Sequence, residues 1–173
     1  MKRRAVVIGV CAAVTAGCTD RLHDVAASTP GDIDVRSRYI NADPLVESHR
    51  LDTRPAGTET HALSFRSAES ANGTLSSDAD DARTFVSETA FVDDGGRAVL
   101  VLVQRLASPG IDVRLGSVSR IGDRALRVGV DEVGTPIDEE PTVHTLLVRL
   151  VDERGPPERI TVSVEGDRVS VSV

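Results

Sequence analysis

Apolar and polar residues alternate along most of the second half of the chain, which predicts short β-strands with one buried face. The alternating runs cover residues 111–115, 126–130, 146–150, 160–164 and 169–173. Residues 98–103, with the sequence AVLVLV, form a continuous apolar run of strand length instead. Such a run is expected of a strand that is buried on both faces.

Glycine-containing turns join these runs into predicted hairpins. Gly122 lies between residues 118–121 and the run at 126–130, and Gly166 lies between the last two runs. Residues 134–142, GTPIDEEPT, form an acidic, proline-containing loop. Short strands separated by turns about every ten residues are typical of an antiparallel sandwich or barrel.

The first half of the chain has weaker patterns. Strands are expected at residues 32–41, 61–66 and 84–92, the last because it is rich in β-branched and aromatic side chains. Loops are expected at residues 51–60 and 67–82. A short helix at residues 42–50 is an alternative to a loop there. The chain as a whole therefore predicts an all-β fold, an antiparallel β-sandwich or barrel-like domain.

The first 17 residues have the pattern of a signal peptide. Lys2, Arg3 and Arg4 form a basic start, and residues 5–16 form an uncharged apolar run. This run is too short to span a bilayer, which needs about 20 apolar residues. The pair Arg3 and Arg4, followed by Ala-Val-Val, fits a twin-arginine export signal, and general secretion is the alternative.

Residues 15–18, Thr-Ala-Gly-Cys, resemble the lipobox of prokaryotic lipoproteins. The resemblance implies cleavage after Gly17, a lipid on the Cys18 thiol and anchoring at the outer face of the cell membrane. An ordinary cleaved signal peptide is the alternative. Cys11 would be removed with the signal, so the mature chain has no second cysteine for a disulfide.

These segments divide the chain into three parts. Residues 1–17 are the expected signal peptide, and residues 18–32 are the expected lipidated cysteine and flexible tether, which is polar and contains a Pro-Gly pair. Residues 33–173 are expected to form a single β-rich domain.

The charge of the chain points to a high-salt environment. There are 27 acidic and 20 basic residues, and Lys2 is the only lysine. Cleavage after Gly17 would remove three positive charges and change the net charge from −7 to −10. Concentrated salt screens such a charge, since the Debye length at 1 M is about 3 Å. The composition resembles that of proteins from extreme halophiles, and we therefore expect a haloarchaeal secreted lipoprotein.

The same composition argues against several classes of partner. Nucleic acid binding depends on basic patches, which an acidic surface lacks. Stacking on bases needs aromatic side chains, and the chain contains only Tyr39, Phe65, Phe85 and Phe91. Residues 97–150 contain an apolar strand, then SPG, then IDVRLGSVSRIGDRALRVGVDE and an acidic proline-containing loop. This order resembles the C-terminal domain of secreted protease-complex-stabilising proteins. That resemblance implies a protein-binding role.

The motifs of catalysis and cofactor binding are absent from the sequence. It contains no nucleophile elbow, phosphate-binding loop or helical histidine pair. We therefore expect no enzyme activity, no cofactor and no metal site formed by His23, His49, His61 and His144. Asp78, Asp80 and Asp81 leave cation binding as an alternative, because hard cations prefer clustered carboxylates.

Asn72-Gly73-Thr74 is a glycosylation sequon in the predicted loop, so Asn72 is a candidate modification site in an exported chain.

The function expected from all these features is that of a membrane-anchored, non-enzymatic module. It would bind a cell-surface protein or stabilise a surface complex, with membrane lipid contacted through Cys18. The alternative is a solute- or cation-binding lipoprotein that uses its acidic loops.

Overall fold

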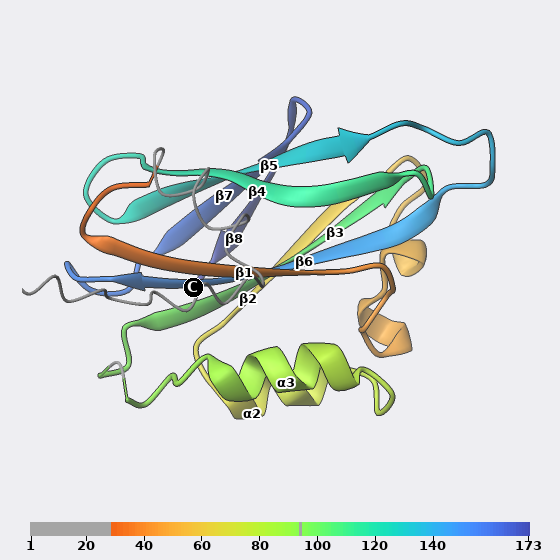
Figure 1. Ribbon diagram of the computed structural model, residues 1–173. Helices are drawn as coiled ribbons and strands as arrows, with labels where there is room; N and C mark the ends of the chain where they lie inside the picture. The colour runs from red at the N-terminus through yellow and green to blue at the C-terminus, as the bar shows by residue number, and fades with distance from the viewer. Residues whose placement is uncertain (1–28, 94) are drawn as a thin grey trace, which may run out of the picture.

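The computed structural model describes residues 29–93 and 95–173, which fold into two packed β-sheets with two helices on one side (Figure 1). The strands are β1 Ile33–Ile40, β2 Thr60–Phe65, β3 Ala98–Ala107, β4 Ile111–Arg120, β5 Ala125–Gly134, β6 Thr142–Asp152, β7 Arg159–Val164 and β8 Asp167–Ser172. The α-helices are α2 Ala68–Thr74 and α3 Asp80–Glu88, and two short 3₁₀-helices are η1 Glu47–His49 and η2 Leu51–Thr53.

Each sheet has four strands. The first sheet has the order β1-β6-β3-β2 and the second has the order β4-β5-β7-β8. Every neighbouring pair is antiparallel except β5 and β7, which are parallel. The parallel pair arises because the chain leaves β5, crosses to the first sheet as β6 and returns as β7. The all-β sandwich predicted from the sequence is confirmed.

The main core lies between the two sheets. Its side chains come from alternate positions of the strands, including Val99, Val101 and Val103 of β3 and Val113 and Leu115 of β4. The alternation seen in the sequence therefore corresponds to the inward faces of the strands. The turn after β4 and the Gly166 turn both lie where the sequence predicts hairpins.

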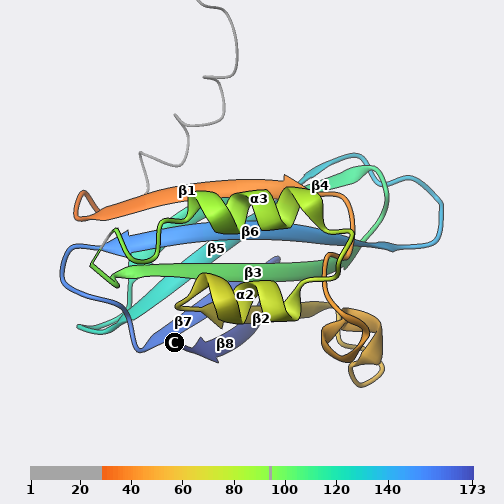
Figure 2. The same ribbon diagram turned by 90° about the horizontal axis from the view of Figure 1, so that it is seen from below.

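A second core lies on the outer face of the first sheet. The helices α2 and α3 cover this face, as Figure 2 shows from below. Phe85 and Val86 of α3 pack there with Leu100, Leu102 and Leu147 of the central strands β3 and β6. These strands are consequently buried on both faces, as the continuous run at residues 98–103 predicts. Each fully buried Leu contributes about 1.5–3 kcal/mol.

Two expectations for the first half of the chain are wrong. The predicted loop at residues 67–82 contains α2 and the start of α3, and the predicted strand at residues 84–92 lies largely within α3. The buried residues Ala82, Phe85 and Val86 of α3, together with its C-cap residue Thr89, follow the i, i+3, i+4, i+7 spacing of a helix face. The packing of this face against the sheet outweighs the strand preference of its β-branched and aromatic side chains.

Local signals also support the two helices. Ser67 caps α2, because its hydroxyl oxygen accepts a hydrogen bond from the Ser70 backbone N–H at 3.2 Å. Asp80 and Asp81 lie in the first turn of α3, where carboxylates favour the helix dipole. The alternative of a short helix at residues 42–50 corresponds to the single 3₁₀ turn η1.

Candidate functional site

The two ends of the sandwich differ in the strand ends and loops that they contain. The proximal end holds the start of β1, the end of β6 and the turn between β4 and β5. The distal end holds the loop of residues 135–141 between β5 and β6, which extends beyond the body of the domain (Figure 1). Polar clusters lie at both ends and on the outer face of the first sheet.

A buried ion pair closes the proximal end. The Arg120 guanidinium donates to both carboxylate oxygens of Asp152, at 2.6 Å and 2.7 Å, and Asp152 is only 3% exposed. Burial opposes ionisation of Asp152, but the Arg120 hydrogen bonds hold its pKa below the usual value. Asp32 lies 2.9 Å from Arg120 and 2.7 Å from Arg154, so the end of the expected tether is fixed to the domain.

A buried arginine lies between the sheets at the distal end. Arg105 donates to Glu132 of β5 at 2.6 Å and to Asp167 of β8 at 2.8 Å. It also donates to the Thr60 hydroxyl of β2 at 3.0 Å. Burial acts to lower the pKa of Arg105, but the surrounding carboxylates raise it overall. The arginine therefore joins strands of both sheets.

The partly buried Tyr39 and the buried His144 form a neighbouring pair. The Tyr39 hydroxyl lies 2.6 Å from His144 Nδ1, and the Thr142 hydroxyl lies 3.2 Å from His144 Nε2. Burial, followed by the nearby Asp112 carboxylate, raises the pKa of Tyr39. Both ring nitrogens of His144 have partners, and the contact with Tyr39 joins β1 to β6.

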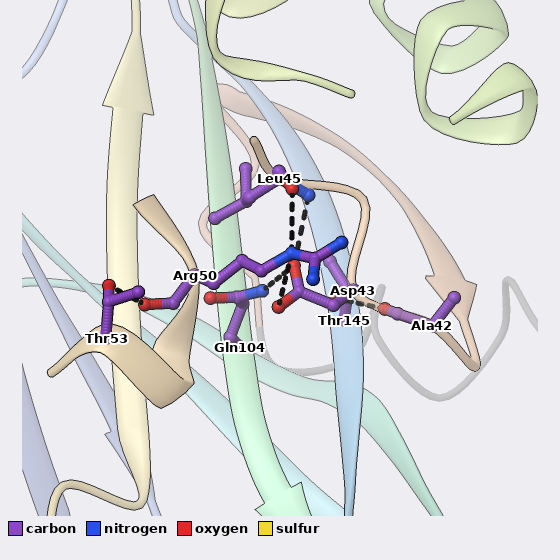
Figure 3. A network of polar contacts seen from close by, with 7 residues as sticks. All are labelled: Ala42, Asp43, Leu45, Arg50, Thr53, Gln104 and Thr145. Carbon is purple, nitrogen blue, oxygen red and sulfur yellow. Dashed lines mark hydrogen bonds and ion pairs between the residues drawn. The ribbon is translucent and has the colours of Figure 1, made fainter. Parts of the chain in front are cut away.

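A polar network on the outer face of the first sheet fixes the segment between β1 and η1 (Figure 3). Asp43 accepts hydrogen bonds through Oδ1 from the buried Gln104 side chain at 2.6 Å and from the Leu45 backbone N–H at 3.0 Å. Thr145 donates to the Ala42 carbonyl at 2.7 Å. The Gln104 Oε1 atom is buried without a protein partner, which suits an ordered water.

His61 lies beside Gln104 in the strand register and contacts Arg54. Arg54 Nη2 lies 3.0 Å from His61 Nε2. Burial, then the positive charges of Arg54 and His49, lowers the pKa of His61 to about 4. His61 is therefore neutral at physiological pH and accepts the hydrogen bond from Arg54.

The acidic residues considered for cation binding lie around a small pocket. Asp78, Asp80 and Asp81 line this pocket, which also contacts Asp43 and has a volume of about 150 Å³, between α3 and the segment after β1. The Ser76 hydroxyl holds the pKa of Asp78 below its usual value. Among the described residues, no three histidine, cysteine or carboxylate side chains are placed to hold one metal ion.

The distal loop is fixed to the domain at its centre. The Ser108 hydroxyl donates to the Ile137 carbonyl at 2.8 Å and accepts from the Ile137 backbone N–H at 2.7 Å. Gly110 is required beneath the loop, because a Cβ there would clash with the Thr135 carbonyl oxygen. The Ile137 side chain is 50% exposed. Around it lie three exposed carboxylates, Asp138, Glu139 and Glu140.

The candidate residues for export and lipid attachment lie outside the described part of the structure, but the candidate glycosylation site Asn72 lies within it. Arg3, Arg4 and Cys18 lie outside the described residues, as does His23. Asn72 lies in α2 and is half-buried, so the sequon is not in a loop as predicted. The sequon hydroxyl of Thr74 donates to the Ser70 carbonyl at 3.0 Å.

Sequence reasoning missed the buried Arg105 and Gln104 and the partly buried Arg120. One signal was present for Arg105, which has the same alternation as the inward-facing Val101 and Val103 and must therefore find partners between the sheets.

No protein-family model matches this chain, and neither a curated protein nor a solved structure matches it.

Proposed function

We propose that this chain is a membrane-anchored extracytoplasmic lipoprotein that acts as a non-enzymatic binding or complex-stabilising module. The lipid on Cys18 is the anchor, and the β-sandwich is the binding part. The resemblance of residues 15–18 to a lipobox supports the anchor. No helix among residues 29–93 and 95–173 is both long and apolar enough to cross a membrane.

The observation that carries the proposal is the placement of the two ends of the sandwich. The chain enters the domain at the proximal end, where Asp32 pairs with Arg120 and Arg154. The loop of residues 135–141 extends from the opposite end (Figure 1). An anchor that precedes β1 would therefore hold the proximal end near the membrane and direct the distal loop away from it, toward other surface proteins.

The polar side chains inside the fold interact mainly with one another, which supports a binding role over a catalytic one. Arg105, Arg120 and Asp152 are occupied by ion pairs that join the strands. Tyr39 and His144 are occupied by each other. These groups hold the scaffold rigid, and the exposed distal loop is left as the more accessible contact surface.

The anchor is tested by fractionation of cells that express the tagged chain. Cys18→Ser is expected to move the protein from washed membranes to the soluble fraction in high salt. Cys11→Ser is the matched control and should leave the protein on the membrane, because Cys11 would be removed with the signal. Retention of the Cys18→Ser protein on washed membranes would contradict the anchor.

The binding role is tested by crosslinking the tagged protein on membranes in high salt, followed by mass spectrometry. We expect one partner protein in stoichiometric amount. Recovery of the intact lipidated protein with no partner would refute the complex-stabilising role and favour a small solute as ligand.

A further inference from the structure

The strand β4 is an edge of the second sheet. It pairs with β5 on one side, and no strand formed by residues 29–93 or 95–173 pairs with its other side. The opposite edge strand, β8, contacts β2, where the Ser64 hydroxyl donates to the Ser172 carbonyl at 2.6 Å. An edge strand carries a row of unpaired backbone N–H and C=O groups, which can pair with a strand of another chain.

The first half of β4 is a short segment with defined limits. Ser108, Pro109 and Gly110 precede it, and a β-bulge interrupts the register between Leu115 and Ser117. Regular pairing along the free edge is therefore restricted to residues 111–115, because a bulge bends the strand and disrupts the ladder.

The side chains of this segment are arranged symmetrically about Val113. Val113 and Leu115 belong to the main core, and Ile111 is also buried. Asp112 and Arg114 lie on either side of Val113, and their side chains are 45% and 50% exposed. They contact each other at 3.2 Å within one strand, and the Asp112 carboxylate also interacts with the Tyr39 hydroxyl of β1. Both charged side chains nevertheless stay about half exposed to solvent at this edge.

We propose that β4 pairs with β4 of a second copy of this chain, antiparallel and centred on Val113. In this register Asp112 lies opposite Arg114 of the second copy, and Arg114 lies opposite its Asp112. Ile111 lies opposite Leu115 in the same way. The interface is isologous, as in most two-fold dimers, and joins the second sheets of the two copies into one continuous sheet.

The charges of Asp112 and Arg114 explain why a second copy of this chain is the proposed partner of β4. Edge strands that avoid pairing usually place charges where they repel an incoming strand. Here the order Asp-Val-Arg gives two attractive pairs when the segment meets itself in the antiparallel direction. Opposite charges placed directly across two strands stabilise the pairing, whereas like charges destabilise it.

The dimer is weak and depends on salt. The five-residue contact is much smaller than a standard interface, which buries about 1,600 Å². Each mature copy would carry a net charge of −10, and this repulsion opposes association in dilute salt. At 1 M salt the Debye length is about 3 Å, so distant charges are screened while charges in contact still interact.

The proposal is tested by sedimentation velocity of the full chain in 1 M KCl, with Cys11→Ser and Cys18→Ser present so that neither lipid nor thiols cause association. A reversible monomer–dimer equilibrium is expected. Arg114→Asp should weaken it about tenfold or more, because two attractive pairs become two repulsive ones. Asp112→Arg should do the same. The matched control is Arg127→Asp, which changes an exposed charge on β5, away from the edge, and should leave the equilibrium unchanged.

Mixing the two single variants gives the sharpest outcome. One variant strand carries two arginines and the other carries two aspartates, so an equimolar mixture should form a heterodimer although neither variant forms a homodimer. Recovery in the mixture also shows that both variants are folded. The proposal is overturned if the parent chain stays monomeric at about 100 μM, a range in which weak specific contacts associate. It is also overturned if Arg114→Asp dimerises like the parent, or if the folded variants stay monomeric when mixed.

Discussion

The buried pair of Arg120 and Asp152 gives a prediction whose magnitude follows from the structure. Asp152→Ala removes a carboxylate that accepts two hydrogen bonds from Arg120, at 2.6 Å and 2.7 Å, and one from the Arg154 backbone N–H at 2.9 Å. The Arg120 side chain is 15% exposed and, among the described residues, would keep Asp32, at 2.9 Å, as its one acidic partner. Its Nε atom is already buried without a partner.

Breaking a buried pair by removing one member costs about 3–5 kcal/mol, because the remaining charge stays buried. Since Asp32 still offsets part of the Arg120 charge, we expect a loss near the lower limit, about 3 kcal/mol. The measurement is urea-induced unfolding at constant salt, with the free energy of unfolding compared between the parent and the variant.

Glu158→Ala is the matched control, because it breaks an ion pair with Arg124 in which both side chains are 63% exposed. Exposed pairs contribute about 0–1 kcal/mol, so this variant should be close to the parent. The joint replacement of Arg120 by Met and Asp152 by Leu should recover most of the lost stability, because no buried charge remains. If Asp152→Ala costs no more than Glu158→Ala, the assignment of Arg120 and Asp152 as a buried, structurally important pair is refuted.

Three further predictions concern the outer face of the first sheet. The pKa of His61 is lowered to about 4, so between pH 6.5 and pH 4 the unfolded chain binds a proton that the folded chain does not. Stability should therefore fall as the pH drops through this window, and His61→Gln should flatten that part of a pH series of urea unfolding curves. Leu102→Ala should cost about 2–5 kcal/mol in the same assay, because Leu102 is fully buried beneath the helices, and Val92→Ala, at a site that is 86% exposed, should be near neutral. Calcium at millimolar concentration in molar KCl should leave the melting temperature unchanged, because the carboxylates around the α3 pocket do not converge on one point. A rise in melting temperature that Asp80→Asn abolishes would instead favour the cation-binding alternative.

The strands of the second half were predictable because their determinants are local. Side chains on a strand alternate between its two faces, so a half-buried strand must alternate in sequence. This applies to β4, β5, β7 and β8, and the turns between paired strands carry the glycines that tight turns need. The continuous apolar run in β3 likewise reports two buried faces.

The helices were harder to predict because their sequences carry conflicting signals. Thr84, Phe85 and Val86 are good strand formers, and α3 has only nine residues. The spacing of Ala82, Phe85, Val86 and Thr89 indicates a helix, but a helix this short is marginal without a surface to pack on. The outer face of β3 and β6 supplies that surface, and it exists only after the sheet has formed.

The sequence by itself determined the strand segments, their hairpin turns, the burial of β3 on both faces and the acidic character of the chain. The tertiary structure alone decided that β5 and β7 are parallel, that α3 covers the first sheet, and that Arg105 and Arg120 pair with carboxylates from distant strands. The physical reason is the range of the forces involved. Backbone dihedrals and side-chain alternation act over a few residues, whereas strand order and buried ion pairs depend on segments that meet only when the whole core is packed.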